Sequence, residues 1–283
     1  MTSDSAASAA PPKPSRAGRD LSAAIGVGVG LGAVIIASLF VVKEAFLLVV
    51  LAAGGIGMWE LGKALRTASV HVPLVPVHVG GGVMLLGSYY GGAEALSVTM
   101  ALTMIAIVVF QLAEGVDGFV RDATAGVFVT AYVPLLGSFV VLMLTEADGP
   151  WRIVVFVVTT IASDTGGYLA GALLGKHPMA PRISPKKSWE GFIGSVLGCM
   201  LAGWLTVAYG LDGPVWVGLL LGVVVATIAT IGDLGESVIK RDLGIKDMGT
   251  LLPGHGGMMD RLDSLLVVAP VCWLVLHLLV PVA

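Results

Sequence analysis

Charged side chains are scarce in this chain. Only 12% of its 283 residues are Asp, Glu, Lys or Arg, whereas 56% are hydrophobic. A soluble domain carries about a quarter charged residues, so the composition excludes an ordinary soluble fold and predicts an all-α protein with several membrane spans. The formal net charge of −3 decides little, because the distribution of cations along a membrane protein matters more than their sum.

Cysteine is scarce as well, and internal repeats are lacking. Cys199 and Cys272 are the two cysteines, and each lies in its own apolar run, far from the other. This spacing excludes a disulfide framework and a cysteine metal site. No repeat of about 20–50 residues is evident, and the two halves of the chain show no inverted symmetry of the kind found in many transporters. Function is therefore to be sought among the few ionisable side chains.

The apolar runs predict a polytopic helical bundle with about nine transmembrane helices, since about 20 apolar residues span the hydrocarbon core. Residues 1–20, which are rich in Ala, Ser and Pro, are expected to form a disordered cytoplasmic tail. Residues 21–150 are expected to hold the N-terminal transmembrane helices, and residues 151–283 a C-terminal transmembrane catalytic region. The predicted spans are 21–42, 45–65, 73–89, 93–111, 123–144, 151–174, 189–209, 214–239 and 259–282.

The cations predict the orientation of these spans. With the tail inside, nine spans place 14 of the 16 Lys and Arg residues on the cytoplasmic face and leave Lys43 and Arg152 outside. Because cytoplasmic loops carry an excess of Lys and Arg, this distribution predicts a cytoplasmic N-terminus and an external C-terminus. It also places every candidate functional residue on the cytoplasmic side of the cell (inner) membrane, where nucleotides are available.

Residues 233–263 interrupt the hydrocarbon with a dense group of ionisable side chains. If the preceding apolar run stays helical, Asp233 and Glu236 share one face, and Lys240 lies one turn further along. Asp260 and Asp263 repeat the spacing where the last predicted helix begins. Ionisable groups at a membrane span are costly to desolvate and are functional candidates by default. Carboxylate oxygens are also the ligands that a hard divalent cation prefers.

The segment between these two carboxylate pairs cannot form a regular helix. It reads Pro253-Gly254-His255-Gly256-Gly257, and its backbone N–H groups are suited to binding phosphate oxygens. Carboxylates for a divalent metal, beside cations and a glycine-rich turn, are the composition of a phosphoryl-transfer site. The alternative interpretation is a charged, solvated loop between helices, which would have no need for Asp233 at the base of a span.

An acidic residue and a pair of lysines complete the candidate set. Asp164 lies inside the sixth predicted span, where a carboxylate needs a cation, a metal or a proton. The alternative is a neutral Asp that hydrogen-bonds to a neighbouring helix. Lys186 and Lys187 precede the seventh span and suit an anionic substrate, although such pairs also act as topology determinants or as contacts to lipid headgroups. Ser188 is expected to cap the helix that follows, with Pro185 stopping helical continuation into it.

Three short motifs lie between residues 237 and 263. They read Ser237-x-Ile239-Lys240-Arg241, Lys246-Asp247-x-Gly249 and Leu252-Pro253-x-His255-Gly256-Gly257-Met258-x-Asp260-Arg261-Leu262-Asp263. Together they resemble the signature of the phosphatidate cytidylyltransferases, also called CDP-diacylglycerol synthases, whose constrained positions are all met across these 27 residues. The segments around Asp164 and Lys186-Lys187 resemble further elements of the family, with Ser188 where Thr is common. The resemblance covers residues 161–263, whereas the first 150 residues agree only in being membrane spans.

The resemblance implies a CTP:phosphatidate cytidylyltransferase, which forms CDP-diacylglycerol and pyrophosphate from CTP and phosphatidic acid. It implies Mg²⁺ as cofactor, with a second cation allowed nearby, and makes Asp233 and Asp260 the direct ligands. Glu236, Asp263 and Asp164 are then expected as further metal ligands or catalytic carboxylates. The two adjacent lysines are expected to take part in catalysis as well as binding. The residues expected to bind the substrates are Lys186, Lys187, Ser188, Lys240, Arg241, His255, Gly256, Gly257 and Arg261.

The same resemblance implies a homodimer in the lipid bilayer, without a nucleic-acid partner. Two other classes of protein stay open as alternatives. A CTP-dependent membrane lipid kinase would share the bundle but would transfer the terminal phosphate to lipid. An ion-coupled transporter would use membrane carboxylates as proton relays, but it predicts charges near the bilayer midplane, whereas most charges here cluster at one end. The D-G-x-x-A-R spacing of the CDP-alcohol phosphotransferases is absent.

Overall fold

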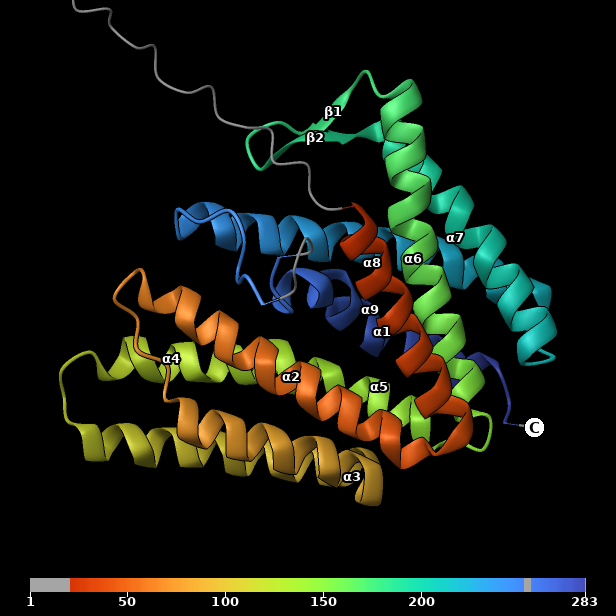
Figure 1. Cartoon of the computed structure of the whole chain (residues 1–283). Coiled ribbons are helices and arrows are strands. Elements are labelled where there is room, and N and C mark those ends of the chain that lie inside the picture. Colours follow the sequence, from red (N-terminus) through yellow and green to blue (C-terminus); the bar gives the residue numbers. More distant parts are fainter. Residues whose placement is uncertain (1–20, 252–255, 283) are drawn as a thin grey trace, which may run out of the picture.

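A computed structural model describes residues 21–251 and 256–282 of the chain. The described chain consists of long helices and one two-stranded hairpin (Figure 1), so the predicted all-α polytopic fold is confirmed. The predicted tail, residues 1–20, lies outside the described residues. In chain order the elements are α1 (Leu21–Val41), α2 (Lys43–Arg66), α3 (Leu74–Glu114), α4 (Phe119–Thr130), the π-helical η1 (Ala131–Leu135), α5 (Leu136–Thr145), α6 (Gly149–Leu174), β1 (Pro178–Ala180), β2 (Ser184–Ser188), α7 (Trp189–Gly210), α8 (Val215–Asp242) and α9 (Met259–Leu279).

The number of membrane crossings depends on how α1 and α3 are counted. Seven helices of the described chain are long and apolar enough to cross a membrane, with residues 119–145 counted as one helix. In α1 the described apolar stretch, Gly32–Val41, is shorter than these seven. Every predicted span coincides with one of the helices or with part of one. The total of nine crossings stays a prediction.

The predicted spans 73–89 and 93–111 are the two halves of α3. The backbone at Gly92 leaves the helical region, with φ 63° and ψ −154°, a conformation that glycine adopts without strain. A Cβ atom on Gly87 would lie 3.2 Å from the Thr99 side chain, and one on Gly80 would collide with Thr103. These contacts pair positions on either side of Gly92, as in an antiparallel hairpin. Figure 1 shows the two halves side by side.

Residues 119–145 form one span with a change of helix type in the middle. The π-helical turn η1 contains Pro134, which has no backbone N–H to donate within a helix. The carbonyl oxygen of Pro134 accepts a 2.7 Å hydrogen bond from the Ser138 hydroxyl. A buried carbonyl at the irregular turn is thereby satisfied, and the helix continues as α5.

Glycine allows α6, α7 and α8 to pack very closely. A Cβ atom on Gly166 would lie 2.5 Å from the backbone oxygen of Gly194, and one on Gly203 of α7 would collide with Gly218 of α8. Small residues let helix backbones approach in this way in membranes. Asp164 of α6 lines a cavity together with residues of both neighbouring helices.

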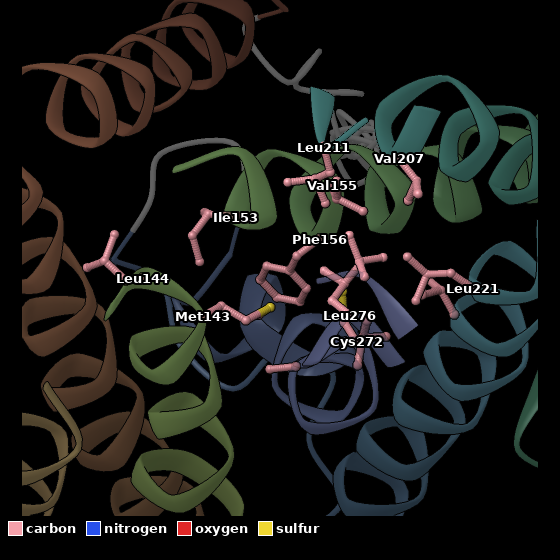
Figure 2. Packing of buried hydrophobic residues seen from close by; sticks show 14 of the residues in the cluster. Met143, Leu144, Ile153, Val155, Phe156, Val207, Leu211, Leu221, Cys272 and Leu276 are labelled. Atoms are coloured by element: carbon pink, nitrogen blue, oxygen red, sulfur yellow. The ribbon is translucent and has the colours of Figure 1, made fainter. Parts of the chain in front are cut away.

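A buried apolar cluster fixes the half of the bundle that lies away from the 233–263 segment. It joins residues of α1 to α3 with residues of α5 to α9, among them Phe156, Leu221 and Cys272 (Figure 2). Both cysteines are free and buried, so no disulfide joins them. The cluster provides rigid packing below the polar ends of α6, α8 and α9.

One of the two predicted external cations is a buried structural residue. Only 2% of the Arg152 surface is exposed, although the distribution of cations placed this residue at the external end of the sixth predicted span. Its Nε donates to Asp148 Oδ1 at 2.6 Å, and its Nη2 donates to the Val280 carbonyl oxygen at 3.0 Å. At the same end, Lys43 Nζ donates to the Glu146 carbonyl oxygen at 3.0 Å. Arg152 therefore joins the start of α6 to the end of α9.

Candidate active site

Two adjoining cavities collect the predicted site residues at the end of the bundle where α8 and α9 are joined. The first, here called the lysine cavity, has a volume of about 330 Å³ and is lined by residues of α6, β1, β2, α7 and α8. The second, the carboxylate cavity, has a volume of about 280 Å³. Asp164 and Asp233 line both cavities, so α6 and α8 form the boundary between them.

The antiparallel hairpin β1–β2 brings the adjacent lysines to the lysine cavity. Lys186, Lys187 and Ser188 all line it, together with hydroxyl groups such as those of Ser195 and Thr230. The Ser188 hydroxyl accepts a 3.1 Å hydrogen bond from the Gly191 N–H at the start of α7, so the predicted helix cap is confirmed. The lysines thus sit on a short strand whose end is fixed by the cap.

Lys187 and Asp233 form an ion pair between β2 and α8. The ammonium also donates to the Thr230 carbonyl oxygen at 3.4 Å. The Asp233 side chain is 40% exposed and the Lys187 side chain 22%, so both groups stay accessible from the cavities. The pair joins the lining of the lysine cavity to a carboxylate that lines both cavities.

The carboxylate cavity carries a large excess of negative charge. Helix α8 continues to Asp242, and the predicted i, i+3 pairs on α8 and α9 do share one cavity. The cations in its lining, among the described residues, are Lys240 and Arg261. Against these stand the six carboxylates of Asp164, Asp233, Glu236, Asp247, Asp260 and Asp263.

Lys240 joins α8 to α9 inside this cavity. Its ammonium lies 2.5 Å from Glu236 Oε2 and 3.0 Å from Asp260 Oδ1. The Asp260 carboxylate also accepts the backbone N–H groups of Met248 at 3.0 Å and Gly257 at 2.8 Å. Lys240 therefore pairs with two buried carboxylates, and Asp260 organises the segment that precedes α9.

The other predicted substrate-binding residues differ in their placement. Gly256 has a φ of 85°, which favours glycine, and Gly257 donates to Asp260. Arg241 is exposed and lies outside the lining of both cavities; its Nε donates to the Ile183 carbonyl oxygen at 3.4 Å, which ties the end of α8 to the β1–β2 turn. His255 lies outside the described residues.

Comparison with known proteins shows which family the chain belongs to. The model of the cytidylyltransferase family matches residues 22–279. The chain belongs to this family. It is 43% identical to the phosphatidate cytidylyltransferase of Mycobacterium leprae over 282 residues, covering 93% of this chain and 90% of the relative. It is 33% identical to the phosphatidate cytidylyltransferase of Helicobacter pylori over 243 residues, covering 84% and 85%. The resemblance seen in the sequence is confirmed and extends over the N-terminal helices as well.

The donor set of this cytidylyltransferase-family protein fits a hard divalent cation. The carboxylate cavity offers oxygen donors with a strong excess of negative charge, and the buried Glu236 Oε1 has no hydrogen-bond partner. Within the described residues no three His, Cys, Asp or Glu side chains already form a metal-binding group. The fit therefore rests on the chemistry of the lining and on this unsatisfied oxygen, and a bound ion would need small side-chain movements around it.

Sequence analysis missed a buried carboxylate from the other half of the chain. Glu60 of α2 is 1% exposed, and its Oε2 accepts the Met259 N–H at 2.8 Å. A Cβ atom on Gly257 would lie 2.6 Å from Glu60 Oε2, and one on Gly249 would collide with the same carboxylate. Glu60 thus holds the residue before Asp260 and explains two glycines of the motif. A single acidic residue inside the second apolar run was the available signal.

We expect Glu60→Ala to loosen the start of α9 in this family member, because it leaves the Met259 N–H buried without an acceptor. Such a loss costs about 1–3 kcal/mol, so thermal unfolding of the purified protein should occur at a lower temperature. Glu60→Gln retains an acceptor oxygen and should recover most of the stability. Glu94→Ala, at an exposed position of α3, is the matched control. Unfolding of Glu60→Ala at the wild-type temperature would show that the contact does not hold α9.

Proposed function

We propose that the protein is a CTP:phosphatidate cytidylyltransferase. A phosphate oxygen of phosphatidate forms a bond to the α-phosphorus of CTP, the bond from that phosphorus to the bridging oxygen breaks, and pyrophosphate leaves. The observation that carries the proposal is the pair of adjoining cavities, one lined by cations and hydroxyls and one by carboxylates, which share Asp164 and Asp233. The family membership and the names of the relatives support the same reaction.

The reaction requires the protein to align and neutralise phosphates more than to form covalent bonds. Lys186 and Lys187 line the lysine cavity and would bind phosphates there, and Arg261 would do so in the carboxylate cavity. Phosphate groups are already ionised at neutral pH, so the attacking oxygen needs no general base. Asp233, Glu236 and Asp263, with Asp260 and Asp164 beside them, would hold Mg²⁺. A bound Mg²⁺ supplies charge neutralisation at the α-phosphate and the leaving pyrophosphate.

The label carried by CTP tests the proposed reaction directly. Purified protein is incubated with phosphatidate, Mg²⁺ and CTP that is radiolabelled at either the α- or the γ-phosphate. A cytidylyltransferase transfers the α label to lipid and leaves the γ label in pyrophosphate. Entry of the γ label into lipid would instead identify a lipid kinase. Absence of both labels from lipid would favour the transporter interpretation.

We expect Lys187→Ala to weaken substrate binding without preventing folding, since Lys187 lies on a short strand outside the membrane-spanning helices. Loss of a charge-assisted hydrogen bond should raise the KM for CTP roughly tenfold to a hundredfold, and Lys186→Ala should act in the same direction. Lys176→Ala is the matched control, because Lys176 is exposed on the same connection between α6 and α7. If Lys186→Ala and Lys187→Ala both kept the wild-type KM values for both substrates, the lysines would be interpreted as topology determinants instead.

The proposed orientation places both cavities on the cytoplasmic side of the cell membrane, where CTP is present, and the enzyme acts as a homodimer. Arg152 and Lys43 lie together at the opposite end, in agreement with the predicted distribution of cations. Reporter fusions at the two termini should give a cytoplasmic N-terminus and an external C-terminus. Both ends reporting the same side would contradict the arrangement with nine crossings.

A further inference from the structure

A third cavity in the described chain is almost wholly apolar. This apolar groove has a volume of about 230 Å³ and lies between α1, α2, α5, α6 and α9. Among the described residues that line it, Arg261 alone carries a charge. The groove reaches the surface of the molecule at α1, where Val34 is 53% exposed. An opening of this kind faces hydrocarbon in a membrane-spanning bundle.

Helix α9 separates the apolar groove from the carboxylate cavity. Asp260, Asp263 and Ser264 line the cavity on one face of the helix. On the other face the groove is lined by Met258, Leu262, Leu265 and Leu266, whose spacing follows the helical period. Arg261 lies between the two faces and lines both spaces. Arg261 therefore lies where the apolar groove meets the carboxylate cavity.

We propose that the apolar groove holds an acyl chain of phosphatidate, with Arg261 binding the lipid phosphate at the groove's inner end. This inference rests on the proposed function and adds the location of the lipid substrate. The substrate has a dianionic phosphate attached to apolar chains, and the groove offers one cationic residue in an otherwise apolar lining. A nucleotide does not fit this lining, because its many polar atoms would be buried without hydrogen-bond partners. We therefore expect CTP to bind in the lysine cavity.

The proposal also accounts for the arrangement of the substrates. The lipid phosphate would approach the carboxylate cavity from the α9 side, while CTP would approach from the hairpin side. Asp164 and Asp233 lie between these approaches, since they line both polar cavities. The two reacting phosphates would meet there without an acyl chain entering a polar space.

A leucine placed in the groove provides the first test. Gly54 of α2 lines the groove, and a Cβ atom there makes ordinary contact with Leu85 at 3.7 Å, so the helix accepts a side chain. Gly54→Leu should raise the KM for dioleoyl phosphatidate about tenfold or more, since a mismatch of a few methylenes has effects of this size. The KM for CTP and the turnover of dihexanoyl phosphatidate should stay at wild-type values, which also shows that the variant folds.

The matched control is Gly55→Leu, the same change at the next position of α2. Gly55 does not line the groove, and apart from its chain neighbours and the backbone of its own helix nothing lies within 4 Å of its Cβ position. Equal effects of the two leucines, or no change in the KM for dioleoyl phosphatidate in Gly54→Leu, would overturn the proposal. An inactive wild-type protein would count against the proposed function instead, which leaves the location of the lipid to a binding measurement.

Photolabelling measures that binding without turnover. Purified protein is irradiated in the absence of CTP with a phosphatidate that carries a diazirine in one acyl chain, and labelled peptides are identified by mass spectrometry. We expect label on groove-lining residues of α2, α5 and α9, such as Val50, Val140 and Leu265. Excess dioleoyl phosphatidate should compete for it, and Gly54→Leu should reduce it. Label spread over all lipid-facing helices, or label that dioleoyl phosphatidylcholine displaces equally well, would show only bulk lipid in the groove.

Discussion

Asp233→Asn should lower kcat/KM by about 10²–10³-fold, the usual size of losing one charge interaction made in the transition state. Asparagine keeps the shape of the side chain and removes its charge. Asp233 lines both polar cavities and pairs with Lys187, so the change affects metal binding and phosphate binding together. The side chain is 40% exposed, and folding and membrane insertion should therefore survive. Turnover of CTP and phosphatidate at limiting Mg²⁺ is the measurement.

Asp242→Asn is the matched control for this variant. Asp242 ends the same helix, is exposed, and lies outside the lining of both polar cavities. Asp148, which looks from the sequence like a silent external carboxylate, is unsuitable, because it pairs with the buried Arg152. Near-normal turnover of Asp233→Asn, or an equal loss in Asp242→Asn, would show that Asp233 is not part of the active site.

Asp260→Asn is expected to differ from Asp233→Asn in its effect on stability. Its carboxylate accepts two backbone N–H groups as well as Lys240, and a carboxamide places an NH₂ group against some of these donors. These contacts predict that Asp260→Asn loses stability as well as activity, whereas Asp233→Asn loses activity alone. If both residues serve one site, the variant that carries both changes should have a kcat only slightly lower than that of the less active single variant.

The fold was largely predictable because hydrocarbon imposes a simple rule on sequence. A segment that crosses a membrane must satisfy its backbone internally and stay apolar over about 20 residues, so apolar runs coincide with helices throughout the described chain. The reversal at Gly92 agrees with two short predicted spans joined by glycines. Hydropathy does not report the π-helical turn at Pro134 or the glycine contacts between α6, α7 and α8, because these depend on neighbouring helices.

The site was predictable where its residues are neighbours along one helix. Helical spacing alone places Asp233 and Glu236, or Asp260 and Asp263, in one cavity. Helical spacing does not predict contacts between residues that are far apart in the sequence. Glu60 reaches Met259 across 199 residues, and Arg152, predicted only to lie on the external side, is buried against the end of α9. Such residues show no spacing pattern, since their partners come from other parts of the chain.

Removal of divalent metal should abolish turnover, and Mg²⁺ should restore it, because carboxylate oxygens select hard cations. The lining of the carboxylate cavity makes the expectation specific to named side chains. Glu236→Gln and Asp263→Asn should each raise the Mg²⁺ concentration for half-maximal activity, by roughly tenfold to a hundredfold if the effect matches other groups around metal sites. Glu236 is the sharper case, since its buried Oε1 has no hydrogen-bond partner and its Oε2 is held by Lys240 at 2.5 Å.

The Mg²⁺ titration separates a metal-binding role from a general loss of activity. A variant that only damages the fold lowers the maximal rate at every Mg²⁺ concentration and leaves the midpoint in place. A variant that loses a ligand moves the midpoint and regains rate as Mg²⁺ is added. Asp242→Asn, at an exposed position on α8, should keep the wild-type midpoint. Robust turnover in metal-free buffer, or one midpoint shared by Glu236→Gln, Asp263→Asn and wild type, would exclude a metal held by these carboxylates.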